Sequence, residues 1–355
     1  MKRITCFKIV VLSLSILFSL TMIEFFLRIV SPSSPFSPLI PLRPYNRMEL
    51  HVKLKGVSPI AIHSTNKWGL RGEDVPADWN KFYTIITIGG STTQCYYLDD
   101  HKTWPYLLQQ RLKEKNDKVW VGNAGLDGQT TRAHLIFMKE VIPKMKPKTV
   151  ILLVGFNDLG LSLSEDARLF GSPWDKTSLK YKIYANSRLI QILHIWKLII
   201  FDKVVVVKKM GHGDYEPKAL VSETPFPSDL RSLLPSLEEY RQNIKKIIDT
   251  AKSMDIRVIF LTQPALYDNT EYWKKIEGGF YWIKKTKNVL SAATFSRLLD
   301  IYNKELMEIC KANNVECFDL ASAVPHSSFY FYDAAHLNEK GAQLVAEKIA
   351  EYFKI

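Results

Sequence analysis

The chain has 355 residues, of which 46% are hydrophobic and 24% charged, a globular composition that excludes whole-chain disorder, collagen and a polytopic membrane protein. Lysine and arginine number 48 against 36 aspartate and glutamate residues, a formal net charge of +12, and half of this excess falls within residues 1–60. Because the basic residues form no stripe with interleaved aromatics and no nucleic-acid module is visible, we expect no nucleic-acid partner.

The amino-terminal segment predicts an export signal. Three basic residues lie within residues 1–8 and precede an apolar run over 9–30, whose only charged residues are Glu24 and Arg28. As a helix this run would reach about 33 Å, enough to cross a bilayer core of about 30 Å. The basic start predicts that residues 1–8 are cytoplasmic and that the chain beyond the helix is periplasmic or extracellular. We expect an uncleaved signal-anchor because no A-x-A-like site follows, and a cleaved signal peptide is the alternative.

Residues 31–80 are expected to form a spacer and an N-terminal extension ahead of a domain over 81–355. Proline and serine are dense over 31–48, which disfavours a regular helix or a central strand. Three cysteines lie beyond the apolar run, so they can form at most one disulfide among themselves. Cys310 with Cys317 is the preferred pair.

Beyond residue 81, short apolar runs rich in β-branched residues alternate with helical patterns. We predict strands over Phe82–Ile88, Val119–Val121, Thr149–Val154, Arg257–Thr262 and Val315–Leu320. We predict helices over Thr103–Lys115, Thr131–Met145, Leu237–Met254, Phe295–Asn313 and Glu339–Phe353. Strands that alternate with helices form a parallel sheet with helices on both faces, so the expected fold is a doubly wound α/β fold.

Residues 164–235 depart from this alternation. The stretch holds an aromatic and basic segment over 181–201, followed by a loop rich in proline and serine. Connections of this length in a compact domain are usually functional or form a small subdomain. We expect a cap beside the site, and a plain structural insertion is an equally acceptable interpretation.

Four unusual segments stand at places where an open α/β sheet binds its ligands, beyond the carboxyl ends of strands. They are Gly89-Gly90-Ser91-Thr92-Thr93, Asn123-Ala124-Gly125-Leu126-Asp127-Gly128-Gln129-Thr130, Gly155-Phe156-Asn157-Asp158 and Asp333-Ala334-Ala335-His336. The first, third and fourth of these segments are each, alone, better explained as a turn, a helix cap or a surface histidine. Their conjunction at one edge of the predicted sheet favours a catalytic site.

The chemistry of these segments is mutually consistent. Ser91 follows two glycines at a helix start, which presents its hydroxyl to solvent as a candidate nucleophile. His336 is the candidate base, and Asp333 would hold its imidazole in one tautomer. The backbone amides of Ser91 and Gly128 and the side-chain amide of Asn157 would stabilise a tetrahedral oxyanion. This combination indicates acyl transfer.

The four segments resemble, in order, the four blocks of the SGNH hydrolase superfamily, which includes the GDSL-type esterases and lipases. The resemblance spans about residues 80–355. It implies a flavodoxin-like, three-layer α/β/α sandwich with a five-stranded parallel sheet. It also assigns the triad and the oxyanion donors to the residues named above.

The resemblance has one departure and one extension. Gly90 replaces the aspartate of the G-D-S-L signature, so the hydrogen bond made by that aspartate is absent. Upstream, Asn66-Lys67-Trp68-Gly69-Leu70-Arg71-Gly72 resembles the N-x-x-G-x-R-G segment of membrane-anchored bacterial members. We assign no catalytic role to this segment.

The expected function is a serine esterase that hydrolyses O-acyl esters, O-acetyl preferred, on a carbohydrate or cell-envelope substrate through an acyl-enzyme on Ser91. An O-acyltransferase acting on an exported polysaccharide, a lipase or lysophospholipase, and a catalytically silent assembly scaffold stay open as alternatives. The histidines and cysteines show no metal-ligand spacing, and the glycines form no nucleotide-binding motif. We therefore expect no metal, no cofactor and no obligate protein partner.

Overall fold

The computed structural model describes residues 2–30, 40, 42–163, 179–193, 230–266 and 292–354. The chain divides into two compact units, one made of residues 1–44 with 174–210 and the other of residues 45–173 with 211–355. Each unit is described by itself.

The larger unit is built on a five-stranded parallel sheet. Its strands are β3 (Tyr83–Gly89), β4 (Val119–Gly125), β5 (Thr149–Leu153), β6 (Arg257–Leu261) and β7 (Glu316–Phe318). They are arranged in the order β4-β3-β5-β6-β7, and every neighbouring pair is parallel. This is the flavodoxin-like order, so the predicted fold class is confirmed.

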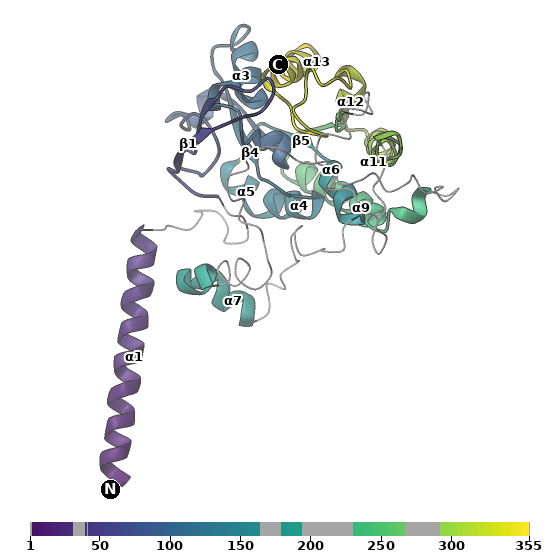
Figure 1. Cartoon of the computed structure of the whole chain (residues 1–355). Coiled ribbons are helices and arrows are strands. Elements are labelled where there is room, and N and C mark those ends of the chain that lie inside the picture. The colour runs from purple at the N-terminus through teal and green to yellow at the C-terminus, as the bar shows by residue number, and fades with distance from the viewer. Residues whose placement is uncertain are drawn as a thin grey trace. The chain divides into compact units, whose positions relative to one another are not determined.

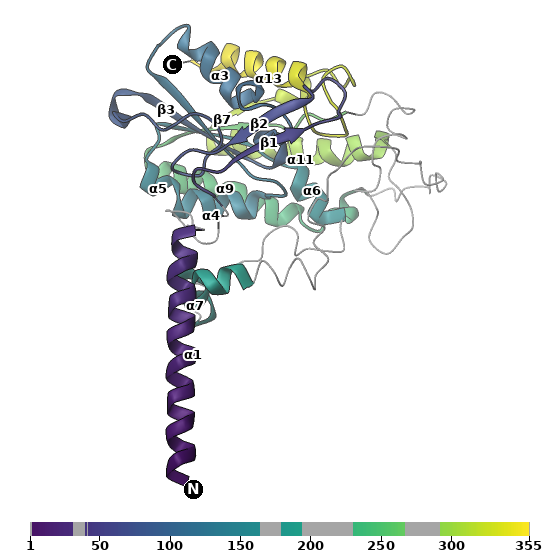
Figure 2. The same ribbon diagram turned by 60° about the vertical axis from the view of Figure 1, so that its left-hand side comes forward.

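Helices cover both faces of this sheet, as Figures 1 and 2 show. On one face lie α3 (Trp104–Lys113) and α13 (Glu339–Tyr352), which pack against each other. On the other face lie α4 (Thr131–Glu140), α9 (Leu237–Ser253) and α11 (Ala292–Asn313). The sheet residues Ile85 and Ile151 share a hydrophobic core with Leu108 of α3 and Val345 of α13. Full burial of such a side chain contributes about 1.5–3 kcal/mol.

Short helices complete this unit, and several of them were not predicted. They are α2 (Ser91–Gln94), α5 (Ile142–Met145), α6 (Phe156–Leu163), α12 (Leu320–Ala323) and the 3₁₀ turns Trp79–Lys81, Asp100–Lys102 and Leu230–Leu233. The single predicted helix over Thr131–Met145 is wrong, because α4 ends at Glu140 and α5 begins at Ile142. Pro143 lies in the first turn of α5. A proline there has no N–H to continue the helix and disfavours helical backbone in the preceding residue.

Strand β4 also extends four residues beyond its prediction. Its last residues include Gly122, Asn123 and Gly125, which have low intrinsic strand propensity. They nevertheless pair in register with β3, as Gly122 with Ile86 and Gly125 with Gly89. Pairing with a neighbouring strand therefore overrides local propensity at this end of the sheet.

Part of the predicted N-terminal extension belongs to the same unit as the sheet. Strands β1 (Arg47–His51) and β2 (Ile60–Ser64) form an antiparallel hairpin. Farther along, the backbone N–H of Arg71 donates to Asn123 O at 2.9 Å, which joins this region to β4. The compact unit begins at Tyr45, before the expected domain start at residue 81.

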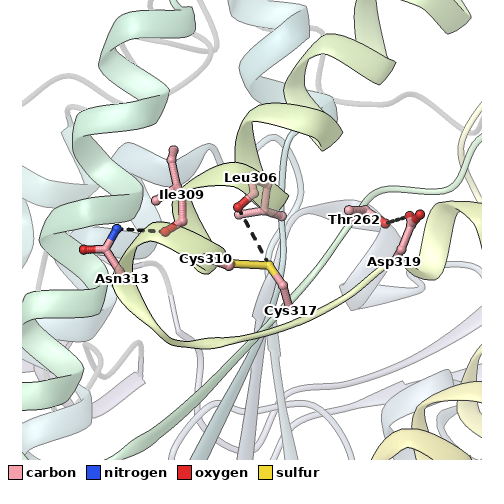
Figure 3. Close-up of a disulfide and its surroundings, with 7 residues drawn as sticks. All are labelled: Thr262, Leu306, Ile309, Cys310, Asn313, Cys317 and Asp319. Atoms are coloured by element: carbon pink, nitrogen blue, oxygen red, sulfur yellow. Dashed lines mark hydrogen bonds between the residues drawn. A yellow bond between two sulfur atoms is a disulfide. The ribbon is translucent and has the colours of Figure 1, made fainter.

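A disulfide joins Cys310 to Cys317, as the sequence predicted (Figure 3). The bond connects the last turns of α11 to β7, and the two Cα atoms lie 6.0 Å apart. A cross-link over a loop this short stabilises the fold by about 2–3 kcal/mol, mainly by restricting the unfolded chain. It therefore ties the last strand of the sheet to the helix that precedes it.

The smaller unit contains α1 (Lys2–Val30) and α7 (Leu179–Asn186), followed by helical residues 188–193. Residues Phe7–Val30 of α1 form a span of 24 residues with a mean hydropathy of 2.3, long and apolar enough to cross a membrane, although a signal sequence has the same properties. Within the 164–235 insertion, residues 164–178 and 194–229 lie outside the described residues. Its role as a cap stays a prediction.

Candidate active site

The nucleophile candidate Ser91 is positioned by a direct contact between two backbones. Strand β3 ends at Gly89, Gly90 caps the helix, and Ser91 is the first residue of α2. On the neighbouring strand, a Cβ atom added to Gly125 would lie 2.2 Å from the backbone nitrogen of Gln94. Only glycine lets α2 pack this closely against the end of β4. The end of β4 therefore sets the position of the short helix that carries Ser91.

Three candidate catalytic side chains meet beyond the end of the sheet. Nε2 of His336 lies 2.8 Å from Oγ of Ser91, across a sequence separation of 245 residues. Nδ1 of the same ring lies 2.7 Å from Oδ2 of Asp333. The serine, the imidazole and the carboxylate therefore form one continuous hydrogen-bonded chain, the arrangement of a nucleophile, its base and the group that orients the base.

Contacts within the turn that carries His336 stabilise its conformation. Oδ1 of Asp333 accepts hydrogen bonds from the backbone N–H groups of Ala335 and His336, at 2.9 and 2.7 Å. The buried ring of Tyr332 stacks on the imidazole with 5.6 Å between centroids and 6° between planes. The Tyr332 N–H also donates to His336 O at 3.0 Å. These contacts hold the imidazole in one orientation.

The charges in this turn oppose the effect of burial. Burial acts to raise the pKa of the Asp333 carboxyl, but the positive charge of His336 and the hydrogen bonds from its ring and from two backbone amides lower it overall. Burial acts to lower the pKa of His336, but the charge and hydrogen bond of Asp333 raise it overall, with a smaller contribution from the charge of Asp127. Asp333 is therefore ionised at neutral pH and favours the protonated imidazole that forms when Ser91 is deprotonated.

The pH dependence of activity should follow the charge of Asp127, an exposed residue of the β4–α4 loop. Because this carboxylate raises the pKa of His336, Asp127→Asn should lower that pKa. The imidazole must be neutral to accept the serine proton, so the rising limb of kcat/KM should move to lower pH. A pH profile of ester hydrolysis measures this shift. Exposed Asp117→Asn is the control, and equal profiles for both variants would contradict the expectation.

Of the predicted oxyanion donors, the Asn157 side chain lines the same pocket as Ser91. The Asn157 side-chain amide donates to Gln129 O at 2.8 Å, and Gly128 takes a left-handed conformation with φ 69° in the same loop. A Cβ atom at Gly90 would lie 2.3 Å from Nδ2 of Asn157. In this chain the Asn157 amide therefore fills the space next to position 90, where the resemblance predicts an aspartate. Ser91, Gln129 and Asn157 line a small pocket that opens to solvent.

The surroundings of two further residues, Asp158 and Cys95, indicate structural roles. The Asp158 carboxylate accepts from the backbone N–H and the hydroxyl of Thr131, which begins α4. Burial raises the pKa of Asp158 to about 6. Cys95 is 6% exposed, and burial raises the pKa of its thiol to about 11. Since the thiolate is the nucleophilic form of cysteine, Cys95 is unsuited to act as a second nucleophile.

Sequence reasoning missed Arg71, to which it gave no role. The guanidinium is 5% exposed, and its Nε donates to Oδ1 of Asp100 at 2.8 Å. Its Nη1 donates to the carbonyls of Gln94 and Cys95, both at 2.5 Å, where α2 ends. Arg71 therefore binds the carboxyl end of the helix that begins with Ser91. The available signal was the resemblance of its segment to N-x-x-G-x-R-G, but no local pattern shows which carbonyls an arginine will meet.

Arg71→Lys should lower kcat by about 10- to 100-fold. A lysine ammonium lacks the planar set of donors that binds several carbonyls and a carboxylate together. The helix that carries Ser91 would therefore shift, and a small displacement of a nucleophile slows the reaction strongly. KM for a small ester should change little, since Arg71 contacts the carboxyl end of α2 and not Ser91 at its beginning. Steady-state kinetics and the rate of labelling by a fluorophosphonate, which reacts with activated serines, measure the effect. Arg111→Lys, on the surface of α3, is the control. Labelling of Arg71→Lys at the wild-type rate would contradict a positioning role.

The chain matches the GDSL-like Lipase/Acylhydrolase family over residues 87–344. It is 31% identical over 125 residues to the GDSL esterase/lipase WDL1 of Oryza sativa subsp. japonica, across 33% of this chain and 44% of that protein. It is 31% identical over 75 residues to Esterase TesA of Pseudomonas aeruginosa, across 21% and 37%. These matches span less than half of the length of either relative.

Solved structures with similarity to this chain include the acetyl xylan esterase AlAXEase, at 16% identity and a TM-score of 0.43, across 76% of this chain and 100% of that one. Another is LAE5, described as an alpha/beta hydrolase enzyme from the metagenome of Lake Arreo, Spain. Its identity is 15% and its TM-score 0.43, across 76% and 94%.

Proposed function

We propose that this chain, which belongs to the GDSL-like lipase/acylhydrolase family, is a serine ester hydrolase whose catalytic triad is Ser91, His336 and Asp333. Its proposed substrates are short O-acyl esters, with O-acetyl preferred, on a carbohydrate or cell-envelope polymer. The observation that carries the triad is the 2.8 Å contact between His336 Nε2 and Ser91 Oγ, with Asp333 bonded to the other ring nitrogen.

In the first half of the proposed reaction, Ser91 Oγ forms a bond to the ester carbonyl carbon while its proton passes to His336 Nε2. Negative charge develops on the carbonyl oxygen, and the backbone amides of Ser91 and Gly128 with the Asn157 amide stabilise it. When the tetrahedral intermediate collapses, the bond to the alcohol oxygen breaks. The imidazolium gives its proton to that oxygen, which leaves an acyl-enzyme on Ser91.

In the second half, water takes the place of the alcohol. His336 accepts a proton from the water as its oxygen attacks the acyl carbon, and then returns that proton to Ser91 Oγ as the acid departs. Asp333 stays ionised in both halves and stabilises each imidazolium, consistent with its lowered pKa. One ester and one water are consumed, and one acid and one alcohol are released.

The preference for a short acyl group is supported by the size of the pocket at Ser91. The described residues leave a free volume of only about 10 Å³ there, on the order of one water molecule, and the pocket opens to solvent. Such a site leaves little space for a long acyl chain, and its open side would leave room for a large alcohol such as a polymer hydroxyl. The lipase alternative would require a longer apolar channel for the acyl chain.

The proposed location is a cell membrane, with residues 1–8 in the cytoplasm, α1 retained as a single span and the catalytic unit outside. The 24-residue apolar span Phe7–Val30 and the basic residues that precede it support this arrangement. Such an enzyme would act on envelope polymers close to the membrane surface.

A chain-length series tests the substrate class. The full chain in lipid nanodiscs would be given p-nitrophenyl acetate, butyrate and octanoate, and acetylated glycans, with Ser91→Ala as the blank. We expect Ser91-dependent release of acetate and a kcat/KM that falls with acyl length. A maximum at octanoate would replace the proposal with a lipase. Turnover only when a glycan hydroxyl is present would indicate an acyltransferase, and no Ser91-dependent adduct with a fluorophosphonate would favour a non-catalytic scaffold.

A further inference from the structure

Within the smaller unit, a charged pair on α1 binds the turn that follows α7. Glu24 Oε1 accepts from the backbone N–H of Arg188 at 2.8 Å. Its Oε2 accepts from the Leu189 N–H and from the Ser187 hydroxyl, both at 2.9 Å. One carboxylate thus satisfies three donors at the start of the helical residues 188–193.

Arg28 completes this connection. It lies one turn after Glu24, and its Nε donates to Glu24 Oε1 at 2.7 Å. Its Nη2 donates to the Asn186 carbonyl at 2.6 Å, where α7 ends. The acid therefore caps the beginning of one helix and the base caps the end of another. Glu24 and Arg28, the two charged residues of the apolar run over 9–30, therefore both have partners in residues 186–189.

The position of Glu24 along α1 sets the depth of this contact. At about 1.5 Å per residue, Glu24 lies about 26 Å from Phe7, where the apolar span begins, and a bilayer core is about 30 Å thick. Glu24 would therefore lie in the outer turn of the core and Arg28 at the membrane–water interface. Ionisable residues in a span are costly unless they are paired, and here the pairs join the span to α7 and residues 188–193.

The segment bound at this depth carries exposed apolar side chains. Leu179 and Ile183 are one turn apart on α7, with exposed fractions of 72% and 46%. Ile190 and Leu193 are one turn apart in the next helix, with exposed fractions of 37% and 57%. Figure 2 shows α7 alongside the carboxyl-terminal half of α1. These side chains are therefore presented where the acyl chains begin.

The charge of the same segment matches an anionic membrane surface. Residues 179–193 contain two lysines and one arginine but no aspartate or glutamate. Basic residues close to a membrane each add about 1 kcal/mol of attraction to anionic headgroups. Apolar and basic side chains on short helices lying in the interface plane are typical of interfacial membrane elements.

We propose that residues 179–193 are an interfacial membrane element that Glu24 and Arg28 hold at the outer end of α1, and that the bilayer is its binding partner. This inference rests on the part of the proposed function that retains α1 as a membrane span. It assigns Glu24 and Arg28 to the docking of residues 179–193, which would then follow the membrane surface.

A fluorescence experiment on the full chain tests the inference. Leu193→Cys would be labelled with an environment-sensitive nitrobenzoxadiazole probe in a Cys6→Ser background, since Cys95 is buried and the other cysteines form the disulfide. The protein would be reconstituted in vesicles of phosphatidylcholine and phosphatidylglycerol. We expect blue-shifted emission and strong quenching by lipids that carry a spin label near the headgroup. A probe as exposed to water as free dye would overturn the inference.

Matched variants test the connection to α1. Glu24→Ala removes the acceptor of three hydrogen bonds, and loss of a helix cap should reduce the ratio of quenched to unquenched probe about fivefold. Thr21→Val is the control, because the Thr21 hydroxyl donates only within α1, to Leu17 O at 2.8 Å. Hydrolysis of p-nitrophenyl acetate would verify that the larger unit of each variant is folded. Equal quenching in Glu24→Ala and Thr21→Val would overturn the role of Glu24.

Mass spectrometry of the membrane-bound protein separates the two possible failures. A chain without residues 1–30 would refute the retained span and, with it, the interfacial element. An intact chain whose position 193 stays exposed to water would refute the interfacial element alone. Retention of residues 1–30 together with Glu24-dependent quenching supports both.

Discussion

Ser91→Ala should lower kcat for p-nitrophenyl acetate by about 10⁴- to 10⁶-fold, and adding His336→Ala should lower it no further. The two side chains act on one proton, because Nε2 of His336 lies 2.8 Å from Oγ of Ser91. Once either side chain is removed, the other can no longer take part in the transfer of the serine proton. Single and double variants measured in one double-mutant cycle would give a coupling energy close to the whole effect of one substitution.

Thermal unfolding supplies the control for this cycle. Both side chains are partly exposed at the end of the sheet, so the alanine variants should melt close to the wild-type temperature. Additive losses of kcat in the double variant would show that Ser91 and His336 do not act together. Unfolding of either single variant would instead mark that residue as structural.

Asp333→Asn should lower kcat by about 10⁴-fold and also change the pH profile of the remaining activity. The Asp333 charge and hydrogen bond raise the pKa of His336, so their loss should lower that pKa. A raised pKa means that the active, neutral imidazole is reached only at higher pH. Without the carboxylate, the rising limb of kcat/KM should therefore move to lower pH while its plateau falls steeply.

The two effects can be measured separately. The plateau comes from kcat/KM at high pH, and the midpoint from the full profile, with the His336 ring titration followed by NMR as an independent check. Asp319→Asn is a suitable control, since Asp319 accepts from the Thr262 hydroxyl at 2.8 Å and lies in another loop. A midpoint that stays at the wild-type pH, or rises, would contradict the electrostatic role given to Asp333.

The sequence was most informative where chemistry is local. Three short motifs limit the chemical roles of the residues in them: Gly-Gly-Ser before a helix, Asn-Asp after a strand and Asp-x-x-His before the last helix. Their order along the chain matches the order of the family's sequence blocks. The strands were found within a few residues because buried parallel strands are apolar over their whole length. The four-residue spacing of Glu24 and Arg28 allows a salt bridge on one face of a helix, but it does not show their partners in residues 186–189.

The sequence by itself therefore determined the fold class, the Cys310–Cys317 pair and the residues that meet around Ser91, because apolar periodicity and short motifs are read from neighbouring positions. Only the tertiary structure decided that Arg71 binds the carboxyl end of α2 and that Gly125 leaves room for the backbone of α2. It also revealed that residues 45–80 belong with the sheet. These features depend on contacts between segments tens of residues apart, whose geometry is set by packing and is not encoded in any local pattern.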